Sequence, residues 1–102
     1  MQVLKFGGSS VANAENMAKV VDIVVNAVDR DRTILVSSAI SGCTDTLIKI
    51  GTLASQRDES YKTLIDELQQ KHHVIIRVFL HLEMQAESQD ICEARFDSLR
   101  SI

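Results

Sequence analysis

The sequence predicts an α/β protein in which a βαβ unit is followed by long helices. Three observations carry this prediction: a short apolar run before a Gly-Gly pair, an amphipathic helical pattern after the pair, and a β-branched run of strand length beyond it. Strands that alternate with a helix in this way are parallel and joined by a right-handed crossover. The loops after both strands therefore leave the sheet at its carboxyl edge, where open α/β sheets bind ligands.

The first half of the chain contains the two strands and the helix between them. Val3 to Phe6 forms the first strand, and Gly7 to Ser10 is the turn that ends it. Asn13 is placed to cap the following helix, because its side chain can accept a free N–H group of the first turn. Thr33 to Ser37 is apolar and rich in β-branched residues, which predicts a buried strand.

The second half is predicted to be helical. A short helix is expected from Thr44 to about Ala54, and a long helix from Asp58 or Glu59 to about Ala86. Apolar residues cover nearly all faces of the second half of the long helix, which predicts burial by several neighbours. Ile91 to Ile102 has the pattern of the start of one more helix.

These elements divide the chain into a βαβ unit over residues 1–57, which carries both loops, and a helical segment over residues 58–102. A sheet of two strands is not stable by itself, so we expect both parts to belong to one truncated domain. Open strand edges and an apolar helix surface also favour self-association. We therefore expect a homo-oligomer.

The composition argues against several classes of partner and site. The 102 residues have a formal net charge of −3, which gives no electrostatic footprint for nucleic acid. No apolar stretch has the length of a membrane span or a secretory signal, so we expect a cytoplasmic protein. Cys43 and Cys92 are far apart in the sequence and are expected to be reduced thiols. His73 and His81 are too far apart for the usual i, i+4 ligand pair, so no metal site is expected.

The turn after the first strand has the composition of a phosphate-binding loop. Adjacent glycines at Gly7 and Gly8 allow backbone conformations closed to other residues and a close approach to a ligand. Their N–H groups can converge on a phosphate, and Lys5 adds a positive charge. The alternative is a tight turn beside a surface lysine. The order of residues is neither GxxxxGK[ST] nor GxGxxG, which argues against a P-loop and a nicotinamide site.

The loop after the second strand is rich in hydroxyl groups. Ser38, Ser41 and Thr44 lie between the strand and a helix start, where hydroxyls and free N–H groups suit a carboxylate. The alternative is that Thr44 is an ordinary N-cap and that the serines satisfy the backbone of the turn.

Two motifs resemble those of a known family. Lys5 to Ala12, KFGGSSVA, resembles the opening signature of aspartokinases, KFGG[TS]SV, and Val11 to Glu15 is most similar to bifunctional aspartokinase–homoserine dehydrogenases. Ser37 to Leu47 is similar to the second motif of the family, SAxSGxT[DN]xL. The resemblance implies the amino-acid-kinase fold, an αβα sandwich around a mainly parallel sheet, of which this chain would be the N-terminal βαβ portion followed by long helices.

The resemblance also implies a reaction. ATP, as its Mg²⁺ complex, would phosphorylate the β-carboxylate of L-aspartate to give 4-phospho-L-aspartate, the first step towards lysine, threonine and methionine. NADP would be a cofactor only where a dehydrogenase domain is also present. The positions that fall on the transferring phosphate are Lys5, Gly7, Gly8 and Ser9, with Lys5 as the catalytic residue. Ser38 and Thr44 fall on positions that contact aspartate.

Several parts of the family's catalytic domain have no counterpart in these residues. They include the glutamate-bearing substrate motif, the later aspartate and lysine near the phosphates, and the adenine-binding loops. We therefore expect the chain alone to be inactive. Two alternatives stay open: another amino-acid kinase, acting on acetylglutamate, glutamate, carbamate or a nucleotide, and a non-catalytic helical interaction module built on residues 58–102.

Overall fold

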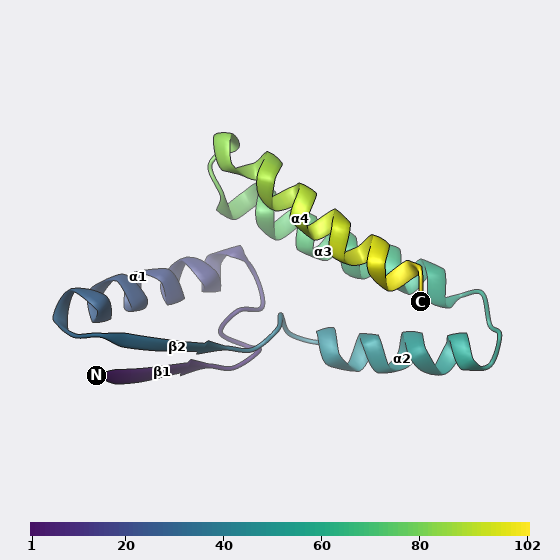
Figure 1. Cartoon of the computed structure of the whole chain (residues 1–102), viewed down its shortest axis with the longest axis horizontal. Coiled ribbons are helices and arrows are strands. Elements are labelled where there is room, and N and C mark those ends of the chain that lie inside the picture. Colours follow the sequence, from purple (N-terminus) through teal and green to yellow (C-terminus); the bar gives the residue numbers. More distant parts are fainter. The chain divides into compact units, whose positions relative to one another are not determined.

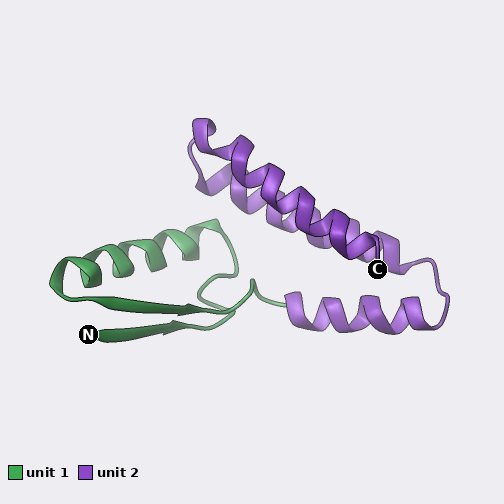
Figure 2. Ribbon diagram, viewed as in Figure 1, with its two compact units in different colours: residues 1–42 green, residues 43–102 purple.

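Two strands and four helices follow one another along the chain (Figure 1). In a computed structural model that describes all residues 1–102, they are β1 (Gln2–Phe6), α1 (Ala14–Arg30), β2 (Thr33–Ser37), α2 (Cys43–Ser55), α3 (Tyr61–Phe79) and α4 (Leu82–Arg100). Residues 1–42 form one compact unit and residues 43–102 a second (Figure 2). The predicted α/β class, with a βαβ unit followed by helices, is confirmed. None of the helices combines the length and apolar character that a membrane span requires.

The first unit contains β1, α1 and β2 in βαβ order. β1 and β2 pair in parallel, with Gln2 opposite Thr33 at one end and Phe6 opposite Ser37 at the other. The side-chain amide of Gln2 donates to the carbonyl of Ala27 at 2.8 Å and to the hydroxyl of Thr33 at 3.1 Å. This one side chain therefore links β1 to both α1 and β2. Figure 1 shows α1 lying along one face of the two strands.

Side-chain hydrogen bonds stabilise both ends of α1. The predicted cap is confirmed, because Oδ1 of Asn13 accepts the N–H of Asn16 at 2.8 Å. At the other end, the carboxylate of Asp31 accepts from the ammonium group of Met1 and from the N–H of Arg32, both at 2.7 Å. These two donors, the ammonium group first, hold the pKa of Asp31 below its usual value.

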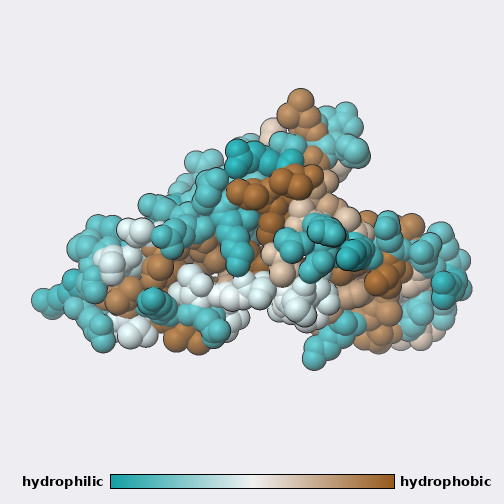
Figure 3. Space-filling model, turned by 180° about the vertical axis from the view of Figure 1, so that it is seen from behind, coloured by the Kyte–Doolittle hydropathy of each residue, from teal (hydrophilic) through white to brown (hydrophobic).

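The prediction that β2 is a buried strand is wrong for this chain. Ile34, Leu35 and Val36 are 46–48% exposed, and Val3 on β1 is 62% exposed. Successive residues of a strand point to opposite faces, so equal exposure of these three residues means that α1 leaves even its own side of β2 partly uncovered and that nothing covers the other face. Apolar residues, brown in Figure 3, are accordingly open to solvent.

The predicted long helix from about residue 58 to residue 86 is in fact two helices. Leu80 and His81 have extended backbones, with ψ of 148° and 149°, so α3 ends at Phe79 and α4 begins at Leu82. The side-chain amide of Gln85 donates to the carbonyl of Leu80 at 2.8 Å and to that of Arg77 at 3.1 Å. It thus satisfies carbonyl groups that the end of α3 leaves free. The helix expected to start near Ile91 is the second half of α4.

The core of the second unit lies between its helices, where α3 packs against both α2 and α4. Its members are almost fully buried: Ile50, Ile65, Leu68, Ile75 and Phe96. The ring of His72 meets that of Phe96 edge-on, with the centroids 5.3 Å apart. Burial of α3 on nearly all faces was also predicted, and this is wrong, since Val78 is 71% exposed. One stripe of buried apolar side chains is enough to pack α3 against its neighbouring helices.

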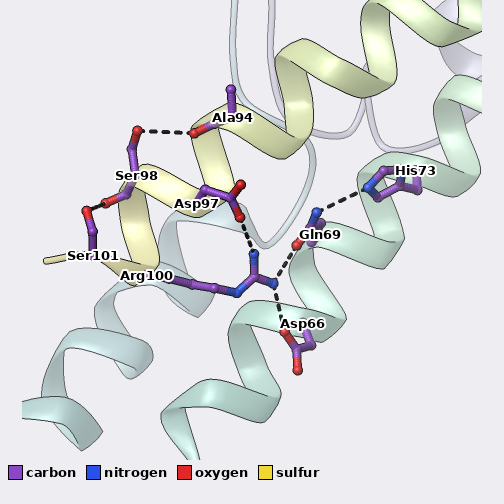
Figure 4. Close-up of polar contacts among 8 residues, drawn as sticks. All are labelled: Asp66, Gln69, His73, Ala94, Asp97, Ser98, Arg100 and Ser101. Atoms are coloured by element: carbon purple, nitrogen blue, oxygen red, sulfur yellow. Dashed lines mark hydrogen bonds and ion pairs between the residues drawn. The ribbon is translucent and has the colours of Figure 1, made fainter.

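Polar contacts join the free ends of α3 and α4 (Figure 4). Arg100 donates to the carboxylates of Asp66 at 2.7 Å and Asp97 at 3.4 Å, and to the side-chain carbonyl of Gln69. The side chains of Asp66 and Asp97 are largely exposed, at 70% and 66%. Exposed pairs of this kind contribute about 0–1 kcal/mol each, so the apolar core holds the helices together and Arg100 fixes their ends.

Candidate functional site

The glycine loop connects β1 to α1 through two successive turns. The N–H of Ser10 donates to the carbonyl of Gly7 at 3.1 Å, and that of Val11 to Gly8 at 3.3 Å. No hydrogen bond within the chain uses the N–H groups of Gly8 and Ser9. Two unpaired backbone donors on neighbouring residues of a loop that leads into a helix are an arrangement that can bind an anion.

The backbone of the glycine pair differs from the expectation. Neither Gly7 nor Gly8 has a positive φ; among the glycines only Gly42 does, at 81°. A Cβ built on Gly7 would meet no atom within 4 Å. At Gly8 it would lie 3.6 Å from Cα of Ser41 and 3.7 Å from Oγ of Ser38, which is ordinary van der Waals contact. The folded chain therefore does not require glycine at either position, and the space beside Gly7 is open.

The second loop lies against the glycine loop. The N–H of Ser38 donates to the carbonyl of Phe6 at 2.9 Å, which extends the parallel pairing one residue beyond β2. The hydroxyl of Ser38 donates to the carbonyl of Ala39 at 2.9 Å and is the side chain nearest to Gly8. The predicted meeting of the two loops at the carboxyl edge of the sheet is thus confirmed for Gly8 and Ser38.

Thr44 lies in the first turn of α2, in the second unit. Because α2 begins at Cys43, Thr44 is a helical residue and not the N-cap that the alternative interpretation required. Its side chain is exposed. Gly42, with its φ of 81°, provides the left-handed backbone between the serine loop and this helix.

Lys5 lies at the carboxyl end of β1 and is exposed. The half-buried residues Leu4 and Phe6 alternate with Lys5 and Val3, so Lys5 is on the sheet face opposite α1. No ion pair within the chain involves its ammonium group. Lys5 therefore supplies an unpaired positive charge at the edge where the two loops meet.

The sequence interpretation missed Asn16, a third contributor to the loop. Its side-chain amide donates to the carbonyl of Ser9 at 3.0 Å. No signal in the sequence predicted this bond, because a capping box would have the side chain of Asn16 accept the N–H of Asn13, whereas here it donates to a carbonyl of the loop. Asn16 also borders a depression of about 280 Å³. The depression is lined by Phe6, Ser9, Ser10, Asn16, Lys19, Val20 and Ile23.

A cavity of about 460 Å³ lies within the second unit, and none of the predicted site residues lines it. Its walls are mainly apolar and include both cysteines, Cys43 and Cys92. Burial raises the pKa of the Cys92 thiol, which keeps it protonated and poorly nucleophilic. The His, Cys, Asp and Glu side chains form no group of three that could bind a metal ion.

Comparison with known proteins supports the family that the motifs of the two loops indicate. Residues 1–98 match the amino acid kinase family. The chain is 38% identical over 68 residues to the bifunctional aspartokinase/homoserine dehydrogenase, chloroplastic, of Daucus carota, which is 67% of this chain and 7% of that protein. It is 32% identical over 78 residues to enzyme 2 of that name from Arabidopsis thaliana, covering 76% of this chain and 8% of that protein. It is 37% identical over 70 residues to enzyme 1 of that name from Zea mays, covering 69% of this chain and 8% of that protein.

The predicted similarity to bifunctional aspartokinase–homoserine dehydrogenases is therefore confirmed. The chain spans only 7–8% of the length of these relatives. The family match covers nearly the whole chain, including both loops, the first five elements and all but the last two residues of α4. The chain belongs to the amino acid kinase family.

Proposed function

We propose that this chain is part of an aspartate kinase, in which ATP phosphorylates the β-carboxylate of L-aspartate to give 4-phospho-L-aspartate. The observation that carries the proposal is the pair of unpaired N–H groups at Gly8 and Ser9, in a loop whose Gly8 lies beside Ser38 at one sheet edge. The names of the relatives support aspartate as the acceptor. Acetylglutamate, glutamate, carbamate and nucleotides are the competing acceptors.

The residues have separate roles in this proposal. Gly7, Gly8 and Ser9 bind the transferring phosphate through backbone N–H groups, and Lys5 neutralises charge that develops on it. Mg²⁺ would enter with the nucleotide and neutralise further phosphate charge. Ser38 and Thr44 bind the aspartate substrate.

We further propose that the 102 residues alone have no kinase activity. Phosphoryl transfer depends on several charges placed around the phosphates, and Lys5 is the only Lys or Arg before α1. A homo-oligomer fits the exposed apolar residues of β2. A cytoplasmic location remains our expectation for this chain, although the relatives are named as chloroplastic. NADP belongs to the proposal only where a dehydrogenase domain is present.

The test is ATP-dependent formation of aspartyl hydroxamate by the kinase that contains this chain. Lys5→Ala should lower kcat about 10²–10³-fold, as expected for loss of one preorganised charge at the reacting phosphate. Lys49→Ala is the matched control, because Lys49 is an exposed lysine of α2 outside the proposed site. Near-wild-type turnover of Lys5→Ala at saturating ATP would contradict the role of Lys5. Turnover with glutamate or acetylglutamate but not with aspartate would assign the chain to another amino-acid kinase.

A further inference from the structure

The peptide between Ser9 and Ser10 is held at both ends. Its carbonyl, on Ser9, accepts the side-chain amide of Asn16 at 3.0 Å. Its N–H, on Ser10, donates to the carbonyl of Gly7 at 3.1 Å. Asn16 is itself fixed, because its own N–H donates to Oδ1 of Asn13 at 2.8 Å. A chain of hydrogen bonds thus runs from the cap of α1 through Asn16 into the glycine loop.

The orientation of this peptide matters for an anion. A carbonyl oxygen carries partial negative charge, so a phosphate is repelled by a loop whose carbonyls turn towards it. Asn16 holds the carbonyl of Ser9 against α1, while the neighbouring N–H groups of Gly8 and Ser9 stay unpaired. Without the amide of Asn16, only the turn bond of Ser10 would resist rotation of the peptide.

We propose that Asn16 is a positioning residue for nucleotide binding. Its side-chain amide fixes the Ser9–Ser10 peptide, so that the N–H groups of Gly8 and Ser9 are ready to receive phosphate oxygens before the nucleotide arrives. Asn16 acts through the loop and does not contact the nucleotide. This inference rests on the proposed function, since it assumes that the glycine loop binds the phosphates of ATP.

Asn16→Asp and Asn16→Ala separate this role from helix stability. Aspartate has nearly the shape of asparagine but cannot donate to the carbonyl of Ser9. At the third helical position its charge favours the helix N-terminus, so the melting temperature of Asn16→Asp should not fall. Alanine removes the donor without adding charge. Asn26→Asp, at an exposed position of the same helix, controls for the added charge, and Asn16→Gln tests whether an amide donor restores function.

In the kinase that contains this chain, both Asn16→Asp and Asn16→Ala should raise the KM for ATP roughly five- to ten-fold, in line with loss of one hydrogen bond. The KM for the acceptor should change less, Asn26→Asp should match the wild type, and Asn16→Gln should recover part of the loss. In the 102-residue chain, hydrogen exchange of the Ser10 N–H should be several-fold faster in Asn16→Ala than in the wild type.

An unchanged KM for ATP in both Asn16 variants, or exchange at Ser10 that matches the wild type, would overturn the inference. So would a rise in the KM for Asn16→Asp that salt abolishes and Asn16→Ala does not share, because the added charge alone would explain it. A wild-type enzyme that phosphorylates a different acceptor refutes aspartate as substrate, but the KM for ATP then still tests Asn16. A wild-type protein without any ATP turnover overturns the proposed function and this inference together.

Discussion

Alanine substitutions at two glycines should separate a glycine kept for ligand access from one kept for backbone conformation. At Gly7 the space around an added Cβ is open and φ is not positive. Alanine there should stabilise the folded chain by about 0.4–1 kcal/mol, because it reduces the conformational freedom of the unfolded chain. Gly42 also has open space, but its φ is 81°. A left-handed backbone costs a residue with a Cβ about 1–2 kcal/mol.

Both substitutions reduce the freedom of the unfolded chain equally, so the two variants should differ by the left-handed cost alone, about 1–2 kcal/mol in the free energy of unfolding, with Gly7→Ala the more stable. The measurement is urea unfolding of the 102-residue chain, followed by far-ultraviolet circular dichroism. Each substitution adds one methyl group to an exposed loop, so each serves as the control for the other.

The affinity for the nucleotide should rank the two variants in the opposite order, with Gly7→Ala the weaker binder. The methyl group of Gly7→Ala projects into the space through which a phosphate reaches the loop, and loss of a hydrogen bond to a charged group costs about 1.5–3 kcal/mol. The KM for ATP should therefore rise roughly ten- to hundred-fold in Gly7→Ala and stay near the wild-type value in Gly42→Ala. A Gly7→Ala variant that loses stability but binds ATP normally would show that the glycine is structural and that the loop does not bind phosphate.

Three further predictions concern the substrate, the core and pH. Thr44→Val should raise the KM for aspartate much more than that for ATP, and equal changes would make the threonine structural. Ile65→Ala should lower the free energy of unfolding of the second unit by about 2–5 kcal/mol. Val78→Ala, on the exposed side of the same helix, should change it by no more than about 0.5 kcal/mol, and similar costs for the two variants would contradict the assigned core. Hydrogen bonds from the N–H of Ser60, and to a smaller extent from its hydroxyl, lower the pKa of Asp58 in the folded chain. This carboxylate therefore stabilises the turn before α3 at pH values above its unfolded pKa. The contribution is lost as the pH falls through the lower pKa of the folded state. A carboxyl ¹³C titration should give a midpoint below about 3.9, the usual value, and Ser60→Ala, which keeps the N–H, should reverse only the smaller part of the shift.

The sequence alone determined the elements and loops that depend on neighbouring residues. The extent of β2, the cap at Asn13 and the parallel pairing all follow from side-chain period, turn composition and the length of the crossover. Residue order likewise placed Gly8 and Ser38 at one edge of the sheet, because parallel strands end on the same side.

Tertiary contacts decided the features that depend on residues far apart in space. The α3 helix ends at Phe79 without Gly or Pro, because Gln85 satisfies its last carbonyls and α4 can then pack back onto α3. The β2 strand is exposed despite its apolar composition. An apolar sequence shows that a strand could be buried, but it does not show whether other elements cover it. The hydrogen bond from Asn16 to Ser9 also required the fold. A side-chain amide has no fixed partner in a sequence, and only the path of the glycine loop brought this carbonyl within its reach.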